Sequence, residues 1–236
     1  MTARKRLIVA LDFPSLHEAQ AMAALLKGRV GMFKVGLELL MSEGPAAVRR
    51  LDEMGAPIFC DAKLHDIPNT VGAAAAALGR LGCAMFNVHA MAGAAAMRAA
   101  RQESERAATQ AGKKRPLVIG VTVLTSLDDS DLAEMGISGT AAERAVRLAL
   151  LCQRAGLDGV VASPLDAAAV KHACGTDFLV VSPGIRPATA AAADQKRTMT
   201  PRQALAAGAD YLVIGRPVTA APDPLHAVEE IVREMK

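Results

Sequence analysis

Aromatic residues are scarce in this 236-residue chain, at 3% of the sequence, with no Trp, one Tyr and five Phe. Surfaces that stack single-stranded nucleic acid are rich in aromatic side chains, so this composition disfavours a nucleic-acid partner. The 27 basic and 24 acidic residues give a formal net charge of +3 and do not gather into a basic block. We therefore predict no polyanion-binding surface, whereas a small anionic ligand is compatible with the sequence.

The sequence also lacks C-x-x-C pairs and long apolar runs. Its four cysteines, Cys60, Cys83, Cys152 and Cys174, lie far apart, as is typical of reduced, buried thiols, so we predict a cytoplasmic location. No uninterrupted apolar run approaches the ~18 residues of a membrane span. The first apolar run, residues 7–11, is interrupted by Asp12 before it reaches signal-peptide length. We expect no membrane association.

Hydrophobic residues make up 52% of the chain, enough for a full-sized core. Short apolar runs recur, each followed by turn residues and by an alanine- and leucine-rich stretch with helical spacing. The eight runs begin near Leu7, Gly31, Pro57, Ala84, Leu117, Leu157, Asp177 and Asp210. The intervals between the first and last starts average 29 residues, about one strand-plus-helix unit each.

Eight such units predict an α/β fold, a TIM (β/α)8 barrel, and the absence of a linker predicts a single domain over residues 1–236. A doubly wound open sheet is the alternative, but no G-x-G-x-x-G follows the first predicted strand. The sequence predicts two helices near the C-terminus. One begins at Pro201 after the capping Thr200, and the other spans residues 224–236. Both folds place ligands at the carboxyl ends of parallel strands, so polar residues there are the functional candidates.

The most informative strand end follows residues 57–60. Asp61 and Lys63 are two apart on the predicted strand, so both side chains point to one face, the barrel interior. An ion pair that only closes the barrel mouth would explain these two residues alone. Lys34 on the preceding strand and Asp66 in the following loop extend them to two cations and two anions, whose burial is costly without partners. Mutual attraction would hold all four ionised, and a cationic lysine can donate a proton.

A second cluster lies at the ends of the seventh and eighth predicted strands. Gly184 precedes Arg186, and Gly215 precedes Arg216. Glycine permits close backbone approach and arginine supplies a bidentate fork, which together suit a phosphate dianion. TIM barrels commonly hold phosphate at these two strand ends. Each glycine alone could be only a turn and each arginine only a solvated charge, but their repetition on adjacent strands favours a phosphate site.

Other polar candidates surround these clusters. Gln195 follows an alanine-rich stretch, residues 188–193, that could close over a phosphate as a lid or be only a connection. Thr125 and Ser126 end the fifth predicted strand and could bind a base or sugar, or only cap a helix.

A metal site is not predicted. Asp61, His65, Asp66 and His89 are residue types that bind metals, but Lys63 lies between the two carboxylates and competes electrostatically.

Residues 61–70, with the sequence D-A-K-L-H-D-I-P-N-T, resemble the D-x-K-x-x-D-I-P-N-T signature of the orotidine 5′-phosphate decarboxylase family. Residues 33–36, with the sequence F-K-V-G, resemble the second-strand lysine motif of that family. The likeness continues in order along essentially the whole chain and is to the bacterial form. It implies a TIM-barrel homodimer that converts orotidine 5′-monophosphate to UMP and carbon dioxide, the last step of de novo UMP synthesis, without a metal or organic cofactor.

The resemblance also implies residue roles. Lys63 would donate the proton, Asp61 would face the substrate carboxylate, and Lys34 and Asp66 would complete the charge network. Residues implied to bind the nucleotide are Asp12 and Thr70 for the ribose, Thr125 and Ser126 for the pyrimidine, and Gln195, Gly215 and Arg216 for the phosphate, with Pro183 and Arg186 nearby. Asp66, Ile67 and Thr70 would complete the active site of the neighbouring subunit.

Two other functions stay open at this point. Sibling phosphosugar decarboxylases or aldolases share a D-x-K-x-x-D barrel but use Mg²⁺, and the continuation through residues 67–70 argues against them. A non-catalytic nucleotide-binding barrel is the second, and the four-charge set would then be costly without a use.

Overall fold

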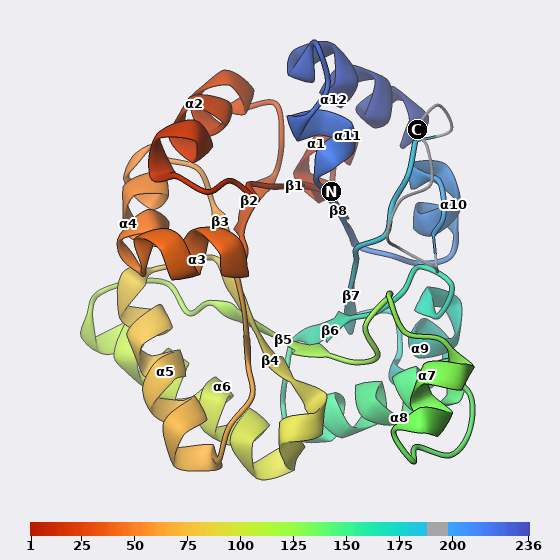
Figure 1. Cartoon of the computed structure of the whole chain (residues 1–236). Helices are drawn as coiled ribbons and strands as arrows, with labels where there is room; N and C mark the ends of the chain where they lie inside the picture. The colour runs from red at the N-terminus through yellow and green to blue at the C-terminus, as the bar shows by residue number, and fades with distance from the viewer. Residues whose placement is uncertain (188–197) are drawn as a thin grey trace.

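Eight parallel strands form a closed ring surrounded by helices (Figure 1), so the predicted TIM barrel is confirmed and the open-sheet alternative is wrong. The computed structural model describes residues 1–187 and 198–236. Each strand pairs with the next along the chain, and β8 pairs with β1 to close the barrel. The strands are β1 (Leu7–Ala10), β2 (Met32–Val35), β3 (Ile58–Leu64), β4 (Met85–His89), β5 (Leu117–Val121), β6 (Gly159–Val161), β7 (Leu179–Ser182) and β8 (Tyr211–Ile214). Every strand begins within two residues of its predicted start.

The helices follow the strands and cover the outside of the ring. They are α1 (Ala3–Arg6), α2 (Leu16–Leu26), α3 (Leu37–Glu43), α4 (Ala46–Glu53), α5 (Pro68–Leu81), the 3-10 helix η1 (Ala90–Ala92), α6 (Gly93–Gln110), α7 (Asp129–Glu134), α8 (Ala141–Arg154), α9 (Ala167–Cys174), α10 (Pro201–Ala206), α11 (Arg216–Thr219) and α12 (Pro224–Glu234). Thr200 caps α10 by accepting a hydrogen bond from the Gln203 N–H, as its position before Pro201 predicts. Within the described residues, none of these helices has both the length and the apolarity that crossing a membrane requires.

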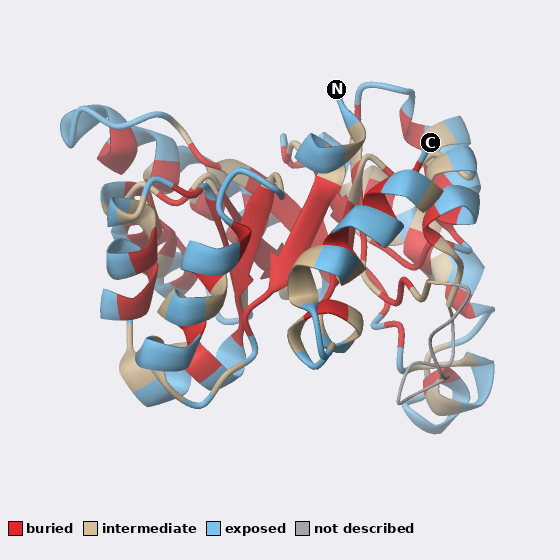
Figure 2. Cartoon of the chain, turned by 90° about the horizontal axis from the view of Figure 1, so that it is seen from above, coloured by how far each residue is buried: buried red, intermediate tan, exposed pale blue. Residues whose placement is uncertain are grey.

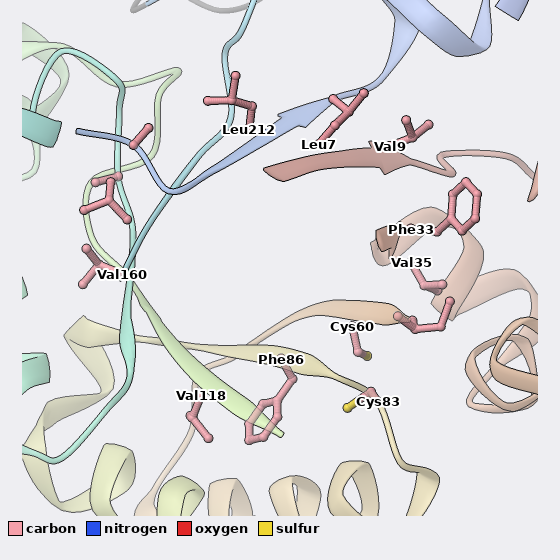
Figure 3. Packing of buried hydrophobic residues seen from close by; sticks show 14 of the residues in the cluster. Leu7, Val9, Phe33, Val35, Cys60, Cys83, Phe86, Val118, Val160 and Leu212 are labelled. Carbon is pink, nitrogen blue, oxygen red and sulfur yellow. The ribbon is translucent and has the colours of Figure 1, made fainter. Parts of the chain in front are cut away.

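The larger part of the core lies between the strands and the helices. Alternate strand residues point outward into this layer, and the helices turn small or aliphatic residues toward it while their outer faces stay exposed (Figure 2). Figure 3 shows members of this layer from several strands, among them Cys60, Cys83 and Phe86. All four cysteines are free and buried, and burial raises the pKa of the Cys60 and Cys152 thiols to about 12.

A smaller cluster fills the barrel interior. It is built from the strand positions that alternate with the outward ones, such as Met32, Phe59 and Met85. Period-two alternation places the residues two positions further along these strands in the next interior layer. In that layer β2, β3 and β4 carry Lys34, Asp61 and Asn87 in place of apolar side chains. The interior thus changes from apolar to polar at the carboxyl ends of three adjacent strands.

Candidate active site

A cavity of about 590 Å³ opens at the carboxyl ends of the strands. Its walls come from strand ends and from the loops that follow them, as in other TIM barrels. Eleven residues that the sequence singled out line it: Asp12, Lys34, Asp61, Lys63, Thr125, Ser126, Pro183, Gly184, Arg186, Gly215 and Arg216. Residues from six different β/α units therefore converge on one space.

Four of these residues form a continuous series of alternating charges. Asp12 Oδ1 lies 2.9 Å from Lys34 Nζ, which lies 3.3 Å from Asp61 Oδ2. Asp61 Oδ1 in turn lies 2.7 Å from Lys63 Nζ. We call these four residues the charge series. Asp61 and Lys63 do share the interior face, as their spacing in the sequence predicts.

The middle of the charge series is buried. The side chains of Lys34 and Asp61 are 10% and 12% exposed, whereas that of Lys63 is 28% exposed. Burial alone would raise the pKa of Asp61, but the charges of Lys34 and Lys63, with hydrogen bonds from Lys63 and Asn87, leave it below the ordinary value. Burial would lower the pKa of Lys34, and the charges of Asp61 and Asp12 raise it instead. Both groups are ionised at neutral pH.

Asn87 belongs to the site although sequence reasoning missed it. It is fully buried on β4, its Nδ2 donates to Asp61 Oδ1 at 2.6 Å, and its Oδ1 accepts from the Lys63 N–H at 2.7 Å. The signal was present in the sequence. Asn87 is a polar residue in an apolar strand, two positions after the interior Met85, so alternation alone places it on the face of Asp61.

Gly36, at the end of β2, leaves room for the first pair of the charge series. A Cβ atom on Gly36 would lie 2.6 Å from both Asp12 Oδ1 and Lys34 Nζ, closer than non-bonded atoms approach. Its backbone, with φ −92°, is in a region open to any residue. Glycine is therefore needed here for space and not for backbone conformation.

The predicted phosphate cluster lines the same cavity. Arg186 and Gly184 follow β7, and Gly215 and Arg216 follow β8. Gly184 has φ +74°, which favours glycine, whereas a Cβ on Gly215 would meet no described atom nearer than 3.5 Å. The two arginines and the charge series thus face one cavity, which offers both a cationic wall and a chain of fixed charges.

Asp66, Ile67 and Thr70 lie outside this cavity. Asp66 is exposed, and its Oδ1 accepts from the Ile67 N–H at 2.6 Å. Ile67 is 66% exposed and Thr70, on the first turn of α5, is exposed too. Within the chain Asp66 therefore does not join Lys34, Asp61 and Lys63, and the second carboxylate on Lys34 is that of Asp12. Gln195 and the predicted lid, residues 188–193, lie outside the described residues.

The two histidines beside the site stack on each other. The rings of His65 and His89 lie 5.2 Å apart between centroids. Burial, followed by the charges of His65 and Lys63, lowers the pKa of His89. Across residues 1–187 and 198–236, no three or more His, Cys, Asp or Glu side chains gather as a metal site would require.

Ionisable side chains converge in a cavity at the carboxyl ends of the strands of a closed (β/α)8 barrel. This is the architecture of a TIM-barrel enzyme. The family model described as "Orotidine 5'-phosphate decarboxylase / HUMPS family" matches residues 5–231. The chain belongs to this family.

Relatives agree with this assignment along the whole chain. An orotidine 5′-phosphate decarboxylase of Moorella thermoacetica is 50% identical, covering 100% of this chain and 94% of that protein. One of Syntrophotalea carbinolica is 49% identical, covering 99% and 96%. The crystal structure of orotidine 5′-phosphate decarboxylase from Lactobacillus acidophilus superposes with a TM-score of 0.86 at 37% identity, covering 98% of each chain.

Proposed function

We propose that this chain, as a single domain over residues 1–236, decarboxylates orotidine 5′-monophosphate to UMP and carbon dioxide in pyrimidine biosynthesis. Membership of the family and the names of the relatives support this reaction. The observation that carries it is the charge series, two carboxylates and two ammonium groups whose successive members lie 2.7–3.3 Å apart in a cavity that Arg186 and Arg216 also line.

The reaction needs fixed charges more than an electron sink. When the bond between C6 and the carboxylate breaks, the electron pair stays on C6 in the plane of the ring, where the π-system cannot delocalise it. Stabilisation must then come from charges that are already in place before the bond breaks. The charge series meets this need without a metal or organic cofactor, and we propose that none is used.

Asp61 and Lys63 have opposite roles in this proposal. The substrate carboxylate lies against Asp61, so its departure as neutral carbon dioxide relieves a repulsion. Negative charge develops at C6 beside Lys63 Nζ, which attracts it and then transfers a proton to C6, leaving a neutral amine. Both changes favour the transition state over the bound substrate. Lys34 holds Asp61 ionised and in place, supported by Asp12 from the other side.

The exposure of the two lysines supports this division of roles. A proton donor must recover its proton from solvent after each turnover. The Lys63 side chain is 28% exposed and that of Lys34 is 10% exposed. Lys63 is therefore the lysine that water reaches more readily, and Lys34 is the one held between two carboxylates.

The remaining cavity residues bind the nucleotide. We propose that Arg186, Gly215 and Arg216, with Pro183 and Gln195, hold the phosphate, that Thr125 and Ser126 bind the pyrimidine, and that Asp12 binds a ribose hydroxyl. Contacts to the phosphate are far from C6, so they supply binding energy that holds the substrate carboxylate against Asp61. A substrate without phosphate should lose turnover as well as affinity.

We infer that the active form is a homodimer. Asp66, Ile67 and Thr70 follow the catalytic strand β3 but are exposed and lie outside the cavity of their own chain, so they are free to reach the site of a second copy. In the dimer these three residues would reach the neighbouring active site, where Asp66 adds a carboxylate and Thr70 binds the ribose. The four free, buried cysteines support a reducing compartment, so we place the enzyme in the cytoplasm.

The decisive test replaces the proton donor. We expect Lys63→Ala to lower the turnover of orotidine 5′-monophosphate by about 10³-fold, since general acid catalysis supplies 10²–10⁴-fold. UMP binding should persist, because the phosphate residues are untouched. Loss of the substrate is followed by ultraviolet absorbance, and UMP binding by titration calorimetry.

Lys114→Ala is the matched control, because Lys114 is exposed just before β5, at the opposite end of the barrel. It should leave turnover unchanged. Wild-type turnover should also be unaffected by EDTA. Near-normal activity of Lys63→Ala would remove Lys63 from its role, and EDTA-sensitive turnover of a phosphosugar in place of the nucleotide would overturn the proposed reaction.

A further inference from the structure

Strands β3 and β4 lose their register beside the charge series. Cys60 pairs with Phe86, and the next paired residues are Leu64 and Val88. Four steps along β3 thus span only two steps along β4, which is a bulge in β3 over residues 61–63. Within it, Lys63 has φ +48° and is the sole non-glycine residue of the described chain with positive φ. Such a conformation costs energy and persists only where surrounding contacts hold it.

Asn87 lies opposite this bulge and bonds to both of its ends. It sits between Phe86 and Val88 on β4, and its side chain points at β3. Its Oδ1 accepts from the backbone N–H of Lys63 at 2.7 Å, and its Nδ2 donates to Asp61 Oδ1 at 2.6 Å. The two contacts fix the orientation of the amide, since an N–H needs an acceptor and a carboxylate needs a donor.

We propose that Asn87 is a positioning residue that aims the proton donor: it holds the Lys63 backbone in its bulged conformation and fixes Asp61 relative to it. This inference rests on the proposed function. With Asn87 in place, Lys63 Nζ and Asp61 Oδ1 are held 2.7 Å apart on the cavity side of β3. Because the amide is fully buried and neutral, it does this without adding a charge to the charge series.

Loss of the Asn87 amide should affect the chemical step and leave substrate binding intact. Asn87 does not line the cavity, and the phosphate residues Arg186 and Arg216 stand on other strands. Without the amide, the Lys63 backbone can relax toward an extended conformation and Nζ is no longer held toward C6. Substrate binding should therefore survive while the chemical step slows.

The first experiment is Asn87→Ala. We expect kcat to fall about 100-fold, the cost of misplacing a reacting group by about 1 Å, with KM changing much less. Ser104→Ala is the matched control: Ser104 is a fully buried polar residue on α6 whose hydroxyl donates to the Arg101 carbonyl. If buried polar groups matter only for packing, both variants will show the same modest change in kcat.

The second experiment is Asn87→Asp, which keeps the shape and the acceptor for the Lys63 N–H. The new carboxylate would face Asp61 across a hydrogen-bond distance, so the two would hold one proton between them, with a raised pKa for the pair. Singly protonated, the pair has the wild-type charge. Activity should thus be present at low pH and be lost as pH rises through that pKa. Lys34, Lys63 and His89, the other titratable groups around the pair, are the same in both proteins.

The outcomes distinguish this inference from the proposed function. A wild-type protein that does not turn over orotidine 5′-monophosphate overturns the function. An active wild type with near-normal kcat in Asn87→Ala overturns only the positioning role. If Asn87→Ala fails to fold, as judged by circular dichroism and UMP binding, Asn87→Asp decides, and a pH profile that matches wild type overturns the role.

Discussion

At the amino ends of the strands charged side chains pair one to one, whereas at the carboxyl ends they share partners in a series around an open cavity. Arg115 forms a bidentate pair with Asp158, with both nitrogen–oxygen distances at 2.8 Å, and Lys171 lies 2.7 Å from Asp210. The hydrogen bonds that Arg115 donates to the Asp158 carboxylate raise the pKa of Arg115. The same residue types thus occur at both ends in different arrangements.

The amino-end aspartates also join neighbouring strands. Asp158 precedes β6, and it bonds to Val118 of β5 twice, through its side-chain Oδ2 and its backbone N–H. Asp210 precedes β8 and bonds to Val180 of β7 in the same two ways. Both follow the sequence A-G-x, at residues 155–157 and 207–209. In this repeated arrangement each aspartate joins two neighbouring strands and also pairs with a cation, so it contributes to the stability of the barrel.

At the carboxyl ends the ion pairs share partners. Asp61 serves Lys34, Lys63 and Asn87 together, and Lys34 serves both Asp61 and Asp12. Burying such charges is costly, and their attraction only partly offsets the cost. On the proposed function, the paired charges at the amino ends contribute mainly to folding, whereas the shared charges at the carboxyl ends serve the reaction.

Of the residues compared, Asp61 should show the largest loss of turnover relative to its loss of stability. We expect Asp61→Asn to lower turnover by about 10³-fold, the upper range for loss of one fixed electrostatic group in an active site. The free energy of unfolding should change by only about 1 kcal/mol, because Lys34 keeps Asp12 as a partner and Lys63 is partly exposed, so neither ammonium group is left buried without a carboxylate or water. Ultraviolet assay and urea unfolding measure the two effects. A large loss of stability with little loss of activity would reverse the assignment of the two ends.

The sequence predicted the barrel because its signals are local. Apolar runs at a regular interval and turn residues between them fix strand starts to within two residues, and Thr200 before Pro201 fixes the start of α10. The pairing of β8 with β1 followed from the number of units alone. The bulge in β3 could not be predicted, because it depends on the contact of Asn87 with Lys63 across two strands.

The site was predictable where spacing decides the face of a strand. Asp61 was placed correctly for this reason, and the same rule applied to Asn87 would have found it. Lys63 also lines the predicted cavity, but it does so from the bulge over residues 61–63, where regular alternation does not hold. Gly36 was seen only as part of a motif, since its role depends on the three-dimensional approach of Asp12 to Lys34. The direction of Asp66 was not predictable, because it lies in a loop beyond the strand.

At the amino ends of the strands, a substitution should lower stability and leave turnover unchanged. We expect Asp158→Ala to lower the free energy of unfolding by about 2–4 kcal/mol, because it removes a bidentate partner of Arg115 and an acceptor for the Val118 N–H. Turnover per folded molecule should stay at the wild-type level. Urea unfolding gives the first quantity and the ultraviolet assay the second.

Asp158→Asn separates the two contacts of this residue, the ion pair with Arg115 and the hydrogen bond from the Val118 N–H. It keeps one oxygen that can accept from Val118 and loses the charge that Arg115 pairs with, so its loss of stability should be the smaller of the two. Equal losses from both variants would show that the charge alone matters. A drop in turnover as large as that of Asp61→Asn would contradict the separation of the two ends.

The smallest effect is expected at Gly36, which tests whether the charge series needs its geometry as well as its charges. Gly36→Ala keeps every charge but places a Cβ 2.6 Å from Asp12 Oδ1 and Lys34 Nζ, so the two must move apart. We expect kcat/KM to fall about tenfold, equal to ~1.4 kcal/mol, within the cost of inserting one methyl group into a packed site. Leu37→Ala, on the exposed first turn of α3, is the control and should leave kcat/KM unchanged. A Gly36→Ala enzyme with wild-type kcat/KM would show that the ends of the Asp12 and Lys34 side chains can shift without loss of function.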